Sequence, residues 1–437
     1  MPTIYDNREH ILSRGINEAL VSSKRADFCI GYFNLRGWKE IADSIESLSG
    51  DTILEGNGIN QIEQKRYCRL LIGMQKAPLE TLLEHYLHDD DFQIDNGNPP
   101  YISLNKIPYH LNIEDFKCSD VYAYIIHRGF QLLNRRSRYG FIVMHNFAFS
   151  RGFLDARKYL ISNSGNAWFS FYARIPAGLF SGDVRVRNCI YLLENNKDTT
   201  KYNYFTTRIH RWFSESRDFL FVKLNYSYFV YTDIIPMFNS HILADFFQTM
   251  RGKKLELYEN KLSANKLFYK KSAYNWIAVS DKPAPCYNSH GKKIPQSKVG
   301  GISLKNTEIA KITLLYLSGK MFLSFWLTYG DEFDVTKDNL FSINTPFDYI
   351  NANDKNNLLS LADDFLNNLD NTIQYKLNAG KKVGTYNTSK LWYITDKSDK
   401  IFLEYLCKNS IEIFEAIEDH ISSTVLTKNE ELEEYEE

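Results

Sequence analysis

The sequence predicts an α/β protein, because strand-like apolar runs alternate with amphipathic helices along its first half. Apolar runs at 26–33, 67–74 and 138–145 predict buried strands. Stretches at 8–23 and 37–48 repeat apolar residues at helical spacing. With 437 residues, 44% of them hydrophobic, the chain can bury a sizeable core, which excludes an intrinsically disordered protein.

The N-terminal part is predicted to be a small helix, strand, helix, strand unit interrupted by a polar, Gly-containing loop at 49–61. Two sequence segments, GYFNLRGW and CRLLIGM, occur in this unit in that order. Residues 5–76 thereby resemble the phospholipase D-like module of helicase and restriction-associated proteins. Active members of that superfamily carry His-x-Lys as nucleophile and cation. This segment has none, so we expect a docking or scaffold module without nuclease activity.

Residues 77–97 are predicted to be a linker. They contain His85 and His88 followed by Asp89, Asp90 and Asp91, residue types that can ligate a metal. The polar end of a helix running into a solvated linker explains the same residues and is favoured. No metal site is therefore predicted.

The chemistry-bearing motif follows at once, as Asn98-Pro99-Pro100-Tyr101. The Asn98 amide oxygen and the Pro99 carbonyl suit acceptance of the two hydrogens of an exocyclic amine on a flipped base. Adjacent prolines fix the backbone and remove competing donors, and Tyr101 offers a ring for stacking. A proline turn with a surface tyrosine explains the same four residues, so the choice between the two interpretations depends on the flanking sequence.

Those surroundings continue the alternation. We predict a helix opened by Ser119-Asp120 and strands at 138–145, 167–174 and 183–195, with a helix at 153–163. This succession ends in a hairpin and resembles, over residues 92–230, the catalytic half of adenine-specific DNA methyltransferases of gamma motif order. Such enzymes belong to restriction-modification and phage-defence systems.

The resemblance implies that adenine is flipped into a pocket made by Asn98, Pro99, Pro100 and Tyr101, the catalytic residues, for methyl transfer from S-adenosyl-L-methionine. It places Asp120 and Tyr122 beside the cofactor. An ordinary helix cap formed with Ser119 is the alternative role for Asp120.

The cofactor motif F-x-G-x-G of that family is not found. Gly56-Asn57-Gly58 is the nearest substitute and lacks a preceding apolar strand. Residues 92–97, FQIDNG, are polar where the family has a buried strand, and 75–97 is too short for the missing strands and helices. Either the chain is a rearranged remnant with an internal deletion, or another subunit completes the cofactor half.

The C-terminal third interleaves lysines with aromatic residues at 253–279, and a Pro/Gly-rich loop at 282–301 carries four more lysines. Lys270, Lys271, Lys292 and Lys293 are therefore candidate DNA-binding residues, with a lysine-rich sheet face as the alternative. The stretch 312–333 resembles the target-recognition domains of large restriction-type methyltransferases, and its apolar stripe is predicted to be core. From 355 onward we expect helix.

The formal net charge of −1 conceals a strong asymmetry. The balance is −6 over residues 1–97, +7 over 98–245, +7 over 246–345 and −9 over 346–437. A basic middle between acidic ends points to nucleic acid, so double-stranded DNA is the expected partner.

Six scattered cysteines form no C-x-x-C pair, and neither a signal sequence nor a long apolar run is present. We therefore expect a cytoplasmic protein with reduced thiols and no membrane contact.

Together these observations predict five regions: a phospholipase D-like module (1–76), a linker (77–97), a partial Rossmann-like methyltransferase sheet (98–235), a mixed α+β recognition domain (236–350) and a helical acidic region (351–437). The predicted function is an adenine-specific DNA methyltransferase-like protein. The alternative is a non-catalytic DNA-recognition or assembly subunit working with helicase, nuclease or other restriction subunits.

Overall fold

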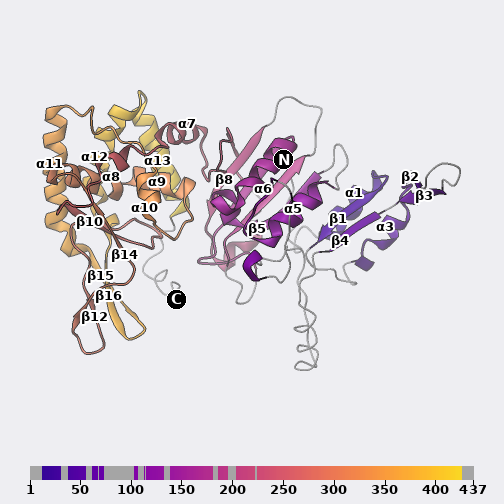
Figure 1. Cartoon of the computed structure of the whole chain (residues 1–437), viewed down its shortest axis with the longest axis horizontal. Coiled ribbons are helices and arrows are strands. Elements are labelled where there is room, and N and C mark those ends of the chain that lie inside the picture. Colours follow the sequence, from indigo (N-terminus) through magenta and orange to yellow (C-terminus); the bar gives the residue numbers. More distant parts are fainter. Residues whose placement is uncertain are drawn as a thin grey trace. The chain divides into compact units, whose positions relative to one another are not determined.

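The computed structural model describes residues 12–30, 38–55, 62–66, 68–72, 103–106, 113, 115–131, 138–180, 186–194, 203–221 and 224–425. Within it the chain forms two compact units. The first comprises Met1–Phe205, Trp212–Tyr226 and Val230–Ile235, and the second comprises Thr206–Arg211, Ser227–Phe229 and Pro236–Glu437. Both mix helices and strands (Figure 1), which confirms the predicted α/β class at that level.

The first unit opens with two helices and two strand pairs: α1 (Leu12–Val21), β1 (Ala26–Ile30), α3 (Ala42–Glu46), β2 (Asp51–Glu55), β3 (Ile62–Arg66) and β4 (Cys68–Ile72). Strands β1 and β4 pair in parallel, with Ala26 opposite Cys68. Leu20 and Ile45 from the two helices pack with Ala26 in a small buried core. The predicted order of helix, strand, helix and strand is therefore confirmed.

The predicted loop at 49–61 is wrong in part. Strand β2 occupies Asp51–Glu55 and pairs antiparallel with β3, with Asp51 opposite Arg66 and Glu55 opposite Ile62. The glycines at 56 and 58 dominated the sequence pattern, although Thr52 and Ile53 are β-branched residues that favour a strand.

The rest of the first unit contains the following elements: η2 (Leu104–Lys106), α5 (Val121–Gln131), β5 (Arg138–Met144), η3 (His145–Ala148), η4 (Arg151–Phe153), α6 (Leu154–Asn163), β6 (Ala167–Tyr172), β7 (Asn188–Glu194) and η5 (Ser214–Phe219). Strand β7 lies antiparallel between β5 and β6, because Asn188 is opposite both Met144 and Tyr172. Strands β5 and β6 therefore run in the same direction, joined through α6, and the predicted terminal hairpin is β6–β7.

Strands β8 (Tyr204–His210) and β9 (Ser227–Phe229) lie where the chain passes from one unit to the other. The second unit then contains a helical body with these elements: α7 (His241–Met250), η6 (Lys254–Tyr258), α8 (Thr307–Ser318), α9 (Lys320–Tyr329), α10 (Lys337–Phe341), α11 (Ala352–Leu369), η7 (Asp370–Thr372), η8 (Thr388–Leu391), α12 (Trp392–Leu406) and α13 (Ser410–Thr424).

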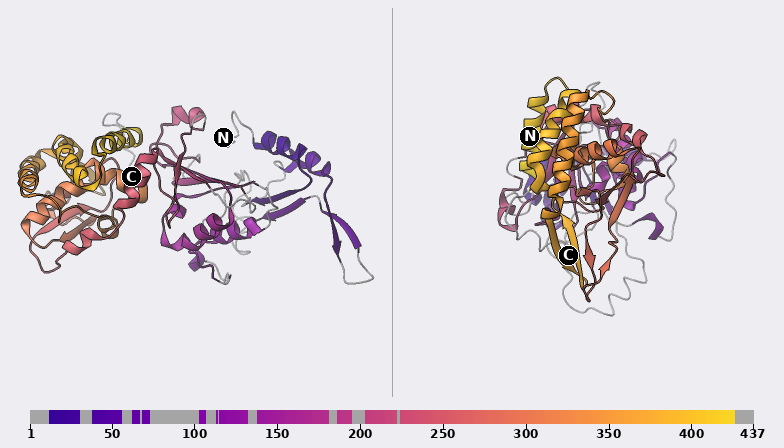
Figure 2. Two further views of the ribbon diagram at one scale, coloured as in Figure 1. Left: turned by 90° about the horizontal axis from the view of Figure 1, so that it is seen from above. Right: turned by 90° about the vertical axis from the view of Figure 1, so that its left-hand side faces the viewer.

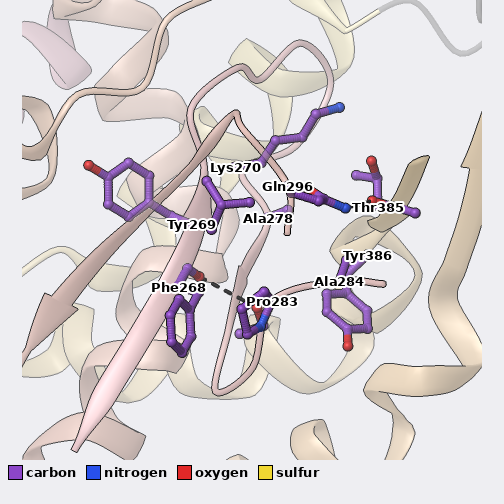
Figure 3. A pocket seen from close by; sticks show the side chains of 12 residues that line it. Phe268, Tyr269, Lys270, Ala278, Pro283, Ala284, Gln296, Thr385 and Tyr386 are labelled. Carbon is purple, nitrogen blue, oxygen red and sulfur yellow. Dashed lines mark hydrogen bonds between the residues drawn. The ribbon is translucent and has the colours of Figure 1, made fainter. Parts of the chain in front are cut away.

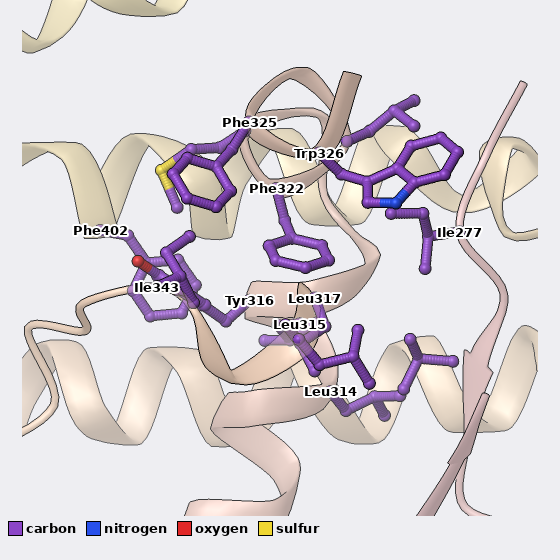
Figure 4. Close-up of a cluster of buried hydrophobic side chains, with 14 of the residues drawn as sticks. Ile277, Leu314, Leu315, Tyr316, Leu317, Phe322, Phe325, Trp326, Ile343 and Phe402 are labelled. Carbon is purple, nitrogen blue, oxygen red and sulfur yellow. The ribbon is translucent and has the colours of Figure 1, made fainter. Parts of the chain in front are cut away.

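The core of this body confirms that the apolar stripe at 312–333 is buried. Tyr316, Phe322 and Trp326 are at most 2% exposed and pack with Phe402 from α12 (Figure 4). Each large apolar side chain buried in this way stabilises the fold by roughly 1.5–3 kcal/mol. The same core continues from Leu243 in α7 to Val425 after α13, so residues on both sides of position 350 share it.

Two small sheets complete the second unit. Strands β10 (Lys266–Lys270), β11 (Val279–Ser280) and β14 (Val299–Ser303) form one, in the order β11-β10-β14. Strands β12 (Cys286–Tyr287), β13 (Lys293–Ile294), β15 (Ile373–Asn378) and β16 (Lys381–Tyr386) form the other, in the order β13-β12-β16-β15.

The expectation of helix throughout the tail from 355 is wrong at one place. Residues 373–386 form the β15–β16 hairpin, which projects from the helical body together with β12 and β13 (Figures 1 and 2). The turn residues Ala379 and Gly380 have φ values of 45° and 75°, the left-handed geometry of a tight hairpin turn. The Ala-Gly pair flanked by alternating residues was the available signal.

Candidate functional site

The predicted catalytic residues Asn98, Pro99, Pro100 and Tyr101 lie outside the described residues, as do His85, His88 and the following aspartates. Ser103 is the first described residue after the motif. That residue forms an antiparallel bridge with Asp120, and the Leu104 backbone N–H donates to the Ser119 carbonyl at 2.9 Å. The segment that follows the motif is therefore fixed at the start of α5.

Asp120 sits at this junction in a half-buried position. Burial raises the pKa of its carboxyl group, and a hydrogen bond from the Ser119 hydroxyl at 3.2 Å partly opposes that rise. The Asp120 carbonyl accepts from the Ala123 N–H in the first turn of α5. Asp120 thus begins the helix and also keeps a carboxyl group partly open to a ligand.

Tyr122 lies one position into α5 and is fully buried. Its ring stacks on Phe153 with the ring centroids 4.8 Å apart, and its hydroxyl donates to the Asn146 side chain at 3.4 Å. Asn146 follows β5 directly, so Tyr122 connects the start of α5 to the end of that strand. With no exposed surface, the Tyr122 side chain packs beneath the start of α5.

Close packing of Gly152 positions the Ser119–Asp120 turn. The Ser119 N–H donates to the Gly152 carbonyl at 3.0 Å. A Cβ atom at Gly152 would lie 2.6 Å from the Ser119 hydroxyl oxygen, so only glycine fits without a shift. The residue therefore allows η4 to approach the start of α5.

Arg157 in α6 forms hydrogen bonds with backbone carbonyls next to this region, and the sequence analysis did not identify it. Its guanidinium is almost fully buried and donates to the carbonyls of Phe147, Ser150 and Asp233 at 2.7–2.9 Å. Burial lowers its pKa. A signal existed, because Arg157 shares the helical spacing of the buried Phe153 and Leu160.

Comparison with known families covers this same region. Residues 39–171 match the Eco57I restriction-modification methylase family. The match runs from just before α3 to near the end of β6 and supports a restriction-modification methyltransferase. It includes residues 98–101 and the Ser103–Asp120 bridge. No curated protein matches the chain.

The described residues do not by themselves make an S-adenosylmethionine site. Strand β2, which precedes Gly56, belongs to an antiparallel hairpin rather than to a parallel sheet, whereas the glycine-rich cofactor turn follows a parallel strand. Tyr122 is buried, which leaves Asp120 as the one predicted cofactor residue with accessible surface.

Lys270 ends β10 in the second unit, where it lines a cavity with Gln296 and Thr385 (Figure 3). The cavity measures about 20 Å³, room for about one water molecule and not for a nucleobase. Lys271 follows Lys270 and is exposed. The structure does not bring these two lysines into the projecting hairpins.

Lys292 and Lys293 are exposed at the β12–β13 hairpin, in the four-stranded sheet that also contains β16. That sheet adds Lys376, Lys381 and Lys382, which the sequence analysis left in the acidic tail. Among the residues described, no group of three His, Cys, Asp or Glu side chains could hold a metal ion. Likewise, within the described part of the chain, no helix has the length and apolarity needed to cross a membrane.

Proposed function

We propose that the protein is an adenine-specific DNA methyltransferase-like component of a restriction-modification or phage-defence system. Adenine is flipped into a pocket formed by Asn98, Pro99, Pro100 and Tyr101 for methyl transfer from S-adenosyl-L-methionine. The family match at residues 39–171, which includes this motif, supports the assignment to restriction-modification methylation. Adenine as the target base rests on the chemistry of the motif.

The observation that carries the proposal is the Ser103–Asp120 bridge. Ser103 follows the proposed motif by two residues, and its bridge joins the segment after the motif to the start of α5. There Asp120 keeps a partly open carboxyl group whose pKa burial raises. Perturbed carboxyl groups of this kind gather at functional sites.

The roles proposed for the chain's own residues concern the base. The Asn98 side-chain oxygen and the Pro99 carbonyl accept the amine hydrogens, which turns the nitrogen lone pair out of conjugation with the ring. Tyr101 stacks on the extruded base and offsets part of the cost of unstacking it. Asp120 orients the segment that follows Tyr101 through the bridge to Ser103.

Part of the N-terminal segment is assigned to the methyltransferase-like region, in contrast to the expectation from sequence. The family match begins at residue 39, inside the stretch that resembles a phospholipase D-like module. This overlap favours residues 39–76 as part of the methyltransferase-like region. The phospholipase D-like resemblance itself stays a prediction.

The second candidate function is a DNA-recognition or assembly subunit without catalysis. It is favoured by the antiparallel pairing of β2 with β3, since Gly56 and Gly58 follow a hairpin strand. In this case a partner subunit supplies the cofactor half, and the chain contributes DNA contacts to a complex with helicase or nuclease subunits.

The deciding experiment measures cofactor binding and transfer with the full chain. Isothermal titration with S-adenosylmethionine, with and without duplex DNA, is followed by transfer of labelled methyl groups and nucleoside mass spectrometry. We expect N6-methyladenine, a loss of at least 100-fold for Asn98→Ala, and retention of most activity in Tyr101→Phe but not in Tyr101→Ala. Absence of cofactor binding in both titrations would overturn the enzymatic proposal in favour of the second candidate.

A further inference from the structure

We infer that the outer face of the β13-β12-β16-β15 sheet is a surface for the phosphate backbone of duplex DNA. It combines the β12–β13 hairpin, whose Lys293 is among the DNA-binding candidates expected from sequence, with the β15–β16 hairpin on the other side of position 350, which the sequence placed in the helical acidic tail. The inference rests on the proposed function for the choice of DNA as partner. Its evidence is the placement of lysine and aromatic side chains on one face.

The register of the four strands defines that face. Tyr287 in β12 is opposite Lys293 in β13 and also opposite Lys382 in β16, and Lys382 is in turn opposite Leu377 in β15. Directly opposed residues project from the same face of a sheet. Tyr375 lies two positions from Leu377 and therefore joins them on this face.

The other face of the sheet points inward. The neighbouring row contains Ile294, Cys286 and Val383, and Cys286 is only 3% exposed. By contrast, Leu377 is 81% exposed and Tyr375 is 42% exposed, and both Lys293 and Lys382 are exposed. The lysine and aromatic side chains therefore meet solvent.

Charge on these two hairpins has one sign. Residues 286–294 contain two lysines and residues 373–386 contain three, and neither range contains aspartate or glutamate. Within the described part of the chain, no ion pair with an acidic side chain involves Lys293, Lys381 or Lys382. Their positive charge is available to an outside anion.

The aromatic side chains contact one another and a lysine on this face. The Lys382 ammonium lies 4.6 Å from the ring centroid of Tyr375, and the rings of Tyr375 and Tyr287 are 6.3 Å apart. At Gly384, opposite Tyr375, a Cβ atom would lie 2.5 Å from the Pro285 carbonyl oxygen and 3.2 Å from the tyrosine ring, so glycine fits mainly because of Pro285 and also leaves room for the ring. Lysines neutralise phosphates, and exposed aromatic rings pack on sugars and bases.

The shape of the hairpins favours duplex DNA over other polyanions. Strands β15 and β16 project from the helical body together with β12 and β13, and β12 pairs with β16 as far as Lys382 near the hairpin turn (Figures 1 and 2). A broad four-stranded face suits contact with the phosphates along a duplex. Lysines also discourage edge strands from aggregating, but that role does not explain an exposed leucine and tyrosine beside them.

The test measures DNA affinity as a function of salt. Fluorescence anisotropy with a 30-base-pair duplex of mixed sequence compares the wild-type chain with the double variant Lys293→Gln/Lys382→Gln, which removes the two lysines of the outer face. We expect on the order of a 10-fold loss of affinity near physiological salt and a decrease of about 1.8 in the slope of log K against log salt, about 0.9 for each lysine. The matched control Lys261→Gln/Lys408→Gln removes the same charge from exposed positions outside the hairpins.

A second variant separates stacking from charge. Tyr375→Ala should weaken binding several-fold without changing the salt slope, and Tyr375→Phe should bind like the wild type. Circular dichroism and thermal midpoints establish that every variant is folded.

The inference is overturned if the hairpin double variant binds like the wild type, or if the control double variant loses as much affinity. Stronger binding of single-stranded DNA or of RNA than of the duplex would overturn duplex DNA as the partner. The proposed function can fail independently. In that case DNA binding would still depend on the hairpin lysines, but S-adenosylmethionine would not bind. Methyl transfer that survives unchanged in the hairpin variant would refute this surface alone.

Discussion

The carboxylate of Asp399 in α12 accepts a hydrogen bond from the Met321 backbone N–H, at 3.0 Å, in the first turn of α9. Asp399 is fully buried. It reaches the helix start past Gly319, where a Cβ atom would lie 2.3 Å from the carboxylate oxygen. The stretch 312–333 therefore divides into α8 and α9 at a glycine that admits a side chain from α12.

The first prediction concerns the pH dependence of stability through Asp399. Burial raises the pKa of this carboxyl group to about 8 from its ordinary value of 3.8. The folded state therefore holds a proton that the unfolded state releases, so the contribution to stability is complete below about pH 4 and is lost as the pH rises through about 8. In Asp399→Asn, which cannot titrate, the free energy of unfolding should fall less between pH 5 and pH 8.5.

Urea denaturation at a series of pH values measures this difference. Glu404→Gln, at an exposed position of the same helix, is the control and should follow the wild type. Parallel curves for Asp399→Asn and the wild type would contradict the assignment.

The second prediction has the opposite sign and concerns His420. Burial lowers the pKa of this imidazole to about 3, with the positive charge of Arg208 as a lesser cause. Its Nδ1 shares a hydrogen bond with the Ser324 hydroxyl at 2.7 Å. The neutral folded state is favoured above pH 6.5, and that stability is lost as the pH falls from 6.5 toward 3.

The contribution of His420 to stability should therefore fall between pH 7 and pH 4.5, opposite to the rise contributed by Asp399, so His420→Gln should be more stable relative to the wild type at pH 4.5 than at pH 7. Exposed His241 offers a matched control, since His241→Gln leaves the wild-type dependence in place. The same pH dependence in all three proteins would contradict the assignment.

The third prediction concerns Arg157. Arg157→Met leaves the carbonyls of Phe147, Ser150 and Asp233 without their shared donor. We expect a destabilisation of about 3 kcal/mol or more. Arg157→Lys should fall in between, because an ammonium lacks the planar fork that reaches several carbonyls.

Chemical denaturation followed by far-UV circular dichroism reports this loss. Lys158→Met removes a neighbouring exposed charge from α6 and should change stability by less than about 0.5 kcal/mol. Equal effects at positions 157 and 158 would remove the structural role assigned to Arg157.

The fourth prediction tests the packing of Gly152 against Ser119. Gly152→Ala places a Cβ atom 2.6 Å from the Ser119 hydroxyl oxygen and should cost about 1–3 kcal/mol. Ser119→Gly removes the obstructing side chain, so the double variant should be more stable than the sum of the single effects predicts. Additive losses in this double-mutant cycle would contradict direct contact.

Much of the fold could be predicted from periodicity. The apolar runs in β1, β4, β5 and β6 and the helical spacing in α5 and α6 are local patterns, and the strands and helices formed near the expected positions. The hairpins β2–β3 and β15–β16 could not be recognised in the same way. Their strands are only five or six residues long, and polar or charged residues interrupt the apolar positions, as in IEQKR and IQYKLN.

The site is less accessible to sequence reasoning than the fold. The NPPY motif suggested chemistry by residue type, but its roles stay a prediction. The bridge between Ser103 and Asp120 joins residues that are 17 positions apart and that no spacing rule connects. Arg157 was overlooked because an arginine on a helix is ordinarily assigned to the surface.

The pairing of β12 with β16 sets a limit on how this chain can be cut and recombined. Any fragment that stops near residue 350 would carry β12 and β13 with one unpaired edge, and would lose the helices α11 to α13 that close the core over α8 and α9. An exposed edge of that kind invites aggregation. A transfer of this region between proteins would therefore have to keep residues 236–425 together with Thr206–Arg211 and Ser227–Phe229 of the same unit.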